Sequence, residues 1–67
     1  MLNIIKIRLG TYAAFQEQKL IGELSKETEW IFTPFNSHPL NQELIENLEE
    51  AITELKFGDV AEAFTVG

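Results

Sequence analysis

One amphipathic helix is predicted by residues 41–58, NQELIENLEEAITELKFG. Its apolar residues recur three and four positions apart, which places them along one face of a helix. They are Leu44, Leu48, Ile52 and Leu55, joined by Ile45 and Ala51. Asn41 is a good N-cap for the first turn, and Gly58 suits the position just past the last one. We therefore expect a helix over residues 41–57.

A row of acidic residues follows the opposite side of this helix. Glu43, Glu46, Glu50 and Glu54 are spaced three and four positions apart, with Glu49 beside them. At a rise of 1.5 Å per residue the row spans about 16 Å. Like charges at this spacing repel, at a cost of a few tenths of a kcal/mol per pair. Two interpretations are open: a solvated face that keeps the protein soluble, or a surface that binds a basic partner.

The net charge of −6 comes from the C-terminal part of the chain. Residues 1–42 hold four acidic and four basic residues, whereas residues 43–67 hold seven acidic residues and one basic residue. A field of one sign selects partners by charge. Direct binding to nucleic acid needs a basic surface, which this chain lacks. We therefore expect a protein partner with a basic surface and no direct contact with nucleic acid.

The residues before the helix predict an antiparallel sheet. In residues 3–9, Ile5, Ile7 and Leu9 alternate with basic residues, which is typical of a strand with one buried face. The other strand-forming segments are residues 11–15, 19–24 and 29–33, joined by turns at Gly10, at Glu17 and Gln18, and at residues 25–28. Strands joined by short turns pair antiparallel with their neighbours.

The fold class that follows is α+β: an antiparallel β-meander of three to four strands, packed on one face by a single amphipathic α-helix. Sixty-seven residues make one domain, over residues 1–67. In the tail, Asp59 could cap a short second helix, or residues 60–66 could add an edge strand. We favour the strand.

The second face of the sheet is a candidate interface. Trp30 and Phe32 alternate with Ile31, so we expect the two aromatic residues in the core and Ile31 on the opposite face. We expect Tyr12 and Ile4 on that face as well, because aromatic and aliphatic residues concentrate in protein interfaces. The chain could then form a homodimer through its sheet.

No catalytic or metal-binding pattern is found in the sequence. His38 is the only histidine, it lies in a loop, and the chain has no cysteine. We therefore expect a protein that is not an enzyme and holds no cofactor or metal. The apolar run at residues 2–7 is interrupted by Lys6 and is too short for a membrane span. We expect no membrane contact and a cytoplasmic location.

The segments IGEL at residues 21–24 and WIFTP at residues 30–34, with one acidic helix, resemble the general plan of small bacterial and phage proteins. The resemblance covers residues 11–56 and implies no mechanism and no residue roles. Compact, acidic, cysteine-free phage proteins often act as stoichiometric inhibitors. Our hypothesis is a non-enzymatic inhibitor of the anti-CRISPR or anti-restriction kind, which docks its acidic helix on a basic nucleic-acid-binding protein. The alternative is a structural or adaptor subunit that self-associates through its sheet.

Overall fold

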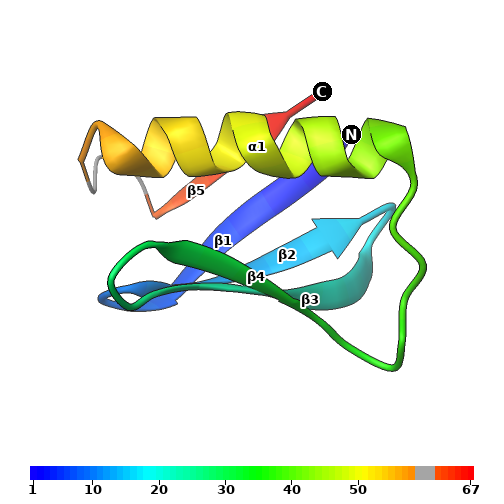
Figure 1. Cartoon of the computed structure of the whole chain (residues 1–67), viewed down its shortest axis with the longest axis horizontal. Coiled ribbons are helices and arrows are strands. Elements are labelled where there is room, and N and C mark those ends of the chain that lie inside the picture. The colour runs from blue at the N-terminus through cyan, green and yellow to red at the C-terminus, as the bar shows by residue number, and fades with distance from the viewer. Residues whose placement is uncertain (59–61) are drawn as a thin grey trace.

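The computed structural model describes residues 1–58 and 62–67. Five strands form one sheet in the order β4-β3-β2-β1-β5, and the helix α1 lies across one face of it (Figure 1). The elements are β1 (Leu2–Arg8), β2 (Thr11–Gln16), β3 (Lys19–Lys26), β4 (Trp30–Pro34), α1 (Gln42–Lys56) and β5 (Ala63–Val66). The predicted α+β fold is confirmed, with one strand more than the three to four predicted.

The extra strand comes from the tail of the chain. β1 to β4 pair in chain order, whereas β5 follows α1 and pairs antiparallel with the free edge of β1. Leu2 is opposite Val66, so the two ends of the chain lie side by side. The predicted edge strand is confirmed for Ala63–Val66. Val60 and Ala61, and Asp59 as the alternative helix cap, lie outside the described residues.

α1 begins where the sequence predicts. The backbone N–H of Leu44 donates to Asn41 Oδ1 at 2.8 Å, and Asn41 itself is extended, as an N-cap residue should be. The buried residues of α1 are Leu44, Leu48, Ala51 and Leu55. Its backbone lies near β5 and β1. α1 therefore covers the sheet along β1 and β5, the two strands that contain the ends of the chain.

The hairpin between β2 and β3 turns at Glu17 and Gln18, as predicted. Their φ angles are 52° and 68°, both in the left-handed region. Two positive φ angles in a row are the signature of a type I′ turn, whose twist matches that of a hairpin. Glutamate and glutamine are poorly suited to this conformation, because their Cβ atoms crowd the following carbonyl.

The observed burial of the side chains of β1 contradicts one prediction. Ile4 and Leu2 are fully buried on the side of α1, whereas Ile5 is 44% exposed and Ile7 is 54% exposed. The predicted alternation placed Ile5, Ile7 and Leu9 on the buried face and treated Ile4 as the exception. It was wrong because β1 is apolar on both sides, and periodicity alone does not say which side a helix will cover.

β3 departs from simple alternation at Ile21. Gly22 is opposite Ala14 and Leu20 is opposite Phe15, so Ile21 is one extra residue in β3. Such a bulge re-aims a side chain, and here Ile21 is 1% exposed and belongs to the core. Simple alternation would place Leu20 on the same face as Gly22 and Leu24; the bulge instead places it on the opposite face, where it is 42% exposed.

β4 has the faces that its sequence predicts. Trp30 and Phe32 pack against the core, while Ile31 between them is exposed on the other face. The Trp30 ring meets the ring of Tyr12 edge to face, with centroids 5.9 Å apart. Aromatic pairs favour this arrangement. β4 is the edge strand farthest from β5, and its aromatic residues close that end of the core.

Candidate functional site

The acidic row of α1 faces solvent, as predicted. Glu43, Glu46, Glu50 and Glu54 are all exposed. Because successive residues are about 100° apart around a helix, these four lie within one quarter of its circumference. The row is the largest concentration of charge that the described part of the chain presents on one element.

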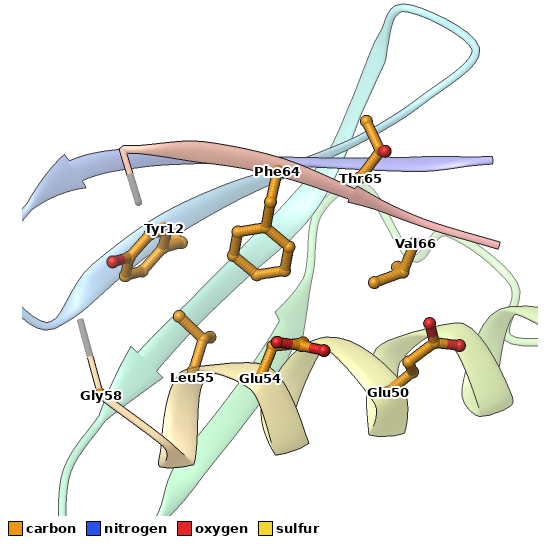
Figure 2. Close-up of a pocket in the computed structure, with 8 residues that line it drawn as sticks. All are labelled: Tyr12, Glu50, Glu54, Leu55, Gly58, Phe64, Thr65 and Val66. Atoms are coloured by element: carbon orange, nitrogen blue, oxygen red, sulfur yellow. The ribbon is translucent and has the colours of Figure 1, made fainter. Parts of the chain in front are cut away.

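Part of this row lines a groove between α1 and β5. Figure 2 shows the Glu50 and Glu54 side chains on the side of α1 that faces β5, with the ring of Phe64 pointing from β5 toward the helix. The groove has a volume of about 260 Å³. Its lining residues are Tyr12, Glu50, Glu54, Leu55, Gly58, Phe64, Thr65 and Val66. The row is therefore one wall of a concave surface as well as a charged face of the helix.

The groove combines carboxylates with aromatic rings. Tyr12 and Phe64 contact each other edge to face, with centroids 6.4 Å apart and an interplanar angle of 64°. Glu50 and Glu54 stand on the opposite wall. Lysine and arginine side chains have apolar stems and charged ends, and their charge is attracted by both carboxylates and ring faces. A long basic side chain is the chemical group that this arrangement suits.

The charge of the row is not neutralised within the described residues. None of its four carboxylates forms an ion pair there. Gln42 Nε2 donates to Glu46 Oε2 at 3.2 Å, which is a contact with a neutral group. Glu46, Glu50 and Glu54 are spaced so that neighbours repel, which slightly destabilises the helix. The row is therefore available to an external positive charge.

Glu49 lies beside the row, as the sequence indicates, and it remains a predicted partner-binding residue. It lies about 100° around the helix from Glu50. Its carbonyl oxygen accepts a hydrogen bond from Thr53 Oγ1 at 2.9 Å, and its side chain is exposed. We therefore define the acidic row as Glu43, Glu46, Glu50 and Glu54 and leave Glu49 outside it.

The three residues predicted on the second face of the sheet, Tyr12, Ile4 and Ile31, lie on different faces. Tyr12 is 1% exposed and belongs to the core beneath α1, so its predicted position on the second face is wrong, as is that of Ile4. β2 is buried on both sides along Thr11, Tyr12 and Ala13, and its sequence alone does not tell the faces apart. Ile31 is 46% exposed on the face away from α1, where it was expected.

Phe64 was not predicted as a site residue, and Tyr12 was predicted for the sheet interface rather than for this groove. They meet because β5 returns to β1 and places Phe64 opposite Ile4, next to β2. The alternation of Phe64 and Val66 with Ala63 and Thr65 is the one sequence signal that could have indicated the groove.

Three other features of residues 1–58 and 62–67 bear on function: possible metal ligands, the single histidine and a possible membrane span. No group of three or more His, Cys, Asp or Glu residues there could hold a metal ion. His38 is half-buried in the loop before α1, and its backbone N–H donates to the Phe35 carbonyl oxygen at 3.0 Å. In the same part of the chain, α1 is too short and too polar to cross a membrane.

Comparison of the chain with protein-family models, with curated proteins and with solved structures gave no match. The functional argument therefore rests on the acidic row, the groove beside it and the exposed faces of the sheet.

Proposed function

We propose that this protein is a non-enzymatic binding protein that docks the acidic row of α1 on a basic surface of another protein. The observation that carries this proposal is the groove in which Glu50 and Glu54 face Tyr12 and Phe64. A row that served solubility alone would need no concave wall and no aromatic floor. A basic side chain of the partner enters the groove, while Glu43 and Glu46 meet further positive charges along the helix.

The spacing of the row bears on the class of partner. Its four carboxylates span about 16 Å, or about one charge per 5.5 Å. One strand of B-form DNA carries a charge about every 3.4 Å, so the row is a sparse substitute for a nucleic-acid backbone. Surfaces that bind nucleic acid are rich in lysine and arginine. We therefore propose an inhibitor that occludes such a surface, of the anti-CRISPR or anti-restriction kind.

The test compares three immobilised proteins: wild type, the Glu46→Lys/Glu50→Lys variant, and the control Glu27→Lys/Glu29→Lys. The control makes the same change of net charge in the loop between β3 and β4 instead of in the acidic row. Each is incubated with the heparin-binding fraction of a host lysate, and the captured proteins are identified by mass spectrometry.

Wild type and the control should capture the same protein, and a DNA duplex should displace it. The Glu46→Lys/Glu50→Lys variant should lose it, with an affinity at least about tenfold lower. Equal capture by all three proteins would contradict the proposal, and so would a captured protein that DNA does not displace.

A further inference from the structure

The face of the sheet away from α1 exposes three large apolar residues among polar ones, and no described helix covers it. Ile5, Leu20 and Ile31 are each more than 40% exposed, and they come from β1, β3 and β4. A solvated sheet face normally carries polar residues at these positions. Exposed apolar residues mark an interaction site where they belong to one continuous surface.

The strand register defines this outer face. Ile5 is opposite Ala13 and Ala63, Phe15 is opposite Asn3 and Leu20, and Ile31 is opposite Ser25. A hollow of about 480 Å³ lies in it. Its lining residues are Asn3, Ile4, Ile5, Phe15, Gln18, Ala63, Phe64 and Thr65. The apolar residues and the hollow are therefore parts of one surface.

We infer that the outer face is the interface of a homodimer, in which two copies pack sheet against sheet. The first argument is charge. At the register positions of this face, Glu23 in β3 and Arg8 at the end of β1 are the described ionisable residues, so the face is neutral. The acidic row lies on the opposite side of the sheet. Face-to-face packing puts the two rows on the outside of the dimer.

The second argument is distance and screening. Packed sheets are about 10 Å apart, and each helix lies beyond its own sheet. This separation exceeds the Debye length of about 8 Å at physiological salt, so the two acidic rows barely repel each other. Association through α1 would instead press the two rows together. Electrostatic repulsion between two copies is therefore weakest when they associate through the outer face.

The third argument is area. Five strands at about 4.8 Å spacing, each with about six residues at 3.3 Å, give a face of about 480 Å² per copy. Two copies bury about 1,000 Å², which is the lower limit for a specific interface. Glu23 in the middle of the face opposes tight packing. The dimer should therefore be weak, with a dissociation constant in the micromolar range.

The test is sedimentation equilibrium over a concentration series that reaches about 200 μM, which exceeds the expected dissociation constant. The wild type should pass from monomer to dimer. Ile5→Lys should raise the dissociation constant at least about tenfold, because it places a charge on an exposed apolar position of the face. The control Leu40→Lys changes an equally exposed residue in the loop before α1 and should behave as wild type. Ile31→Ser serves as a second variant, and circular dichroism checks the fold of each.

A wild type that stays monomeric overturns the inference, and so does a dimer that both Ile5→Lys and Ile31→Ser leave intact. Species larger than a dimer also overturn it, since two faces packed about a twofold axis form a closed pair. The inference is independent of the proposed function. A monomeric Ile5→Lys should still bind the basic partner, whereas Glu46→Lys/Glu50→Lys should still dimerise.

Discussion

Ile4 and Ile5 are neighbours in β1 and lie on opposite faces of the sheet: Ile4 is 0% exposed beneath α1, whereas Ile5 is 44% exposed. The sheet thus carries large apolar residues on both faces, and α1 covers one of the faces. The face beneath α1, which holds Ile4, should contribute to the stability of the monomer. The outer face, which holds Ile5, should contribute to the association of two copies. The first prediction tests this difference.

Ile4→Ala should lower the free energy of unfolding by about 2–5 kcal/mol, because it leaves a cavity in the core. Ile5→Ala should cost less than about 1 kcal/mol, since solvent already reaches its side chain. Urea denaturation at low protein concentration, where the monomer prevails, measures both. Equal losses for the two variants would show that the outer face is covered within one chain.

Asn41→Ala should lower the free energy of unfolding by about 1 kcal/mol. It removes the side-chain oxygen that accepts from the Leu44 N–H at 2.8 Å and leaves that donor unpaired. The measurement is the urea midpoint at a constant m-value. Asn41→Asp, which keeps the capping oxygen, is the control and should stay within about 0.5 kcal/mol of wild type. A similar loss in both variants would rule out capping as the cause.

Replacing Glu17 and Gln18 by Asn-Gly should raise the free energy of unfolding by about 1–2 kcal/mol. Both residues have positive φ angles, of 52° and 68°, which asparagine and glycine adopt at much lower cost. Thermal unfolding measures the gain. Glu17→Gln removes the same charge without easing the backbone, and it should leave the melting temperature nearly unchanged. A gain of equal size in that control would assign the effect to charge.

Gly22→Ala should destabilise the protein by about 1–3 kcal/mol. A Cβ atom at this position would lie 2.6 Å from Phe32 Cζ and would also meet the Thr33 carbonyl oxygen. The control is Ser25→Ala in the same strand, which should change the free energy of unfolding by less than about 0.5 kcal/mol. Chemical denaturation compares the two. A neutral Gly22→Ala would mean that β4 can move away from β3 at little cost.

Glu50→Lys should fold at least as stably as wild type, with a gain of up to about 1 kcal/mol. A lysine there has Glu46 and Glu54 four residues away on either side, so two repulsive pairs become attractive. Urea denaturation at low salt measures the gain, which high salt should remove. This prediction separates folding from docking. Lost partner binding in a variant that is more stable than wild type cannot be attributed to unfolding.

The sequence predicted the elements of the fold better than the faces of its strands. The spacing of Leu44, Leu48 and Leu55 and the cap at Asn41 are local, and both are confirmed. The same holds for the turn at Glu17 and Gln18. These features depend on neighbours in the chain, which periodicity and capping preferences describe directly.

The errors concern contacts between distant segments. Tyr12 is buried because α1 and β5 cover its side of β2, and Ile21 is buried because a bulge turns it inward. The groove beside the acidic row exists only once β5 has paired with β1. Strands that are apolar on both sides carry no signal that distinguishes the covered side from the exposed one.

The central claim is that the acidic row and its groove form the docking face. The most direct measurement is a titration of the isotope-labelled protein with the captured partner, followed by NMR. The account predicts that shift changes concentrate in the second half of α1, around Glu50 and Glu54, and in β5, around Phe64 and Val66. Changes centred on Ile31 and the outer face of the sheet, with α1 unaffected, would contradict it.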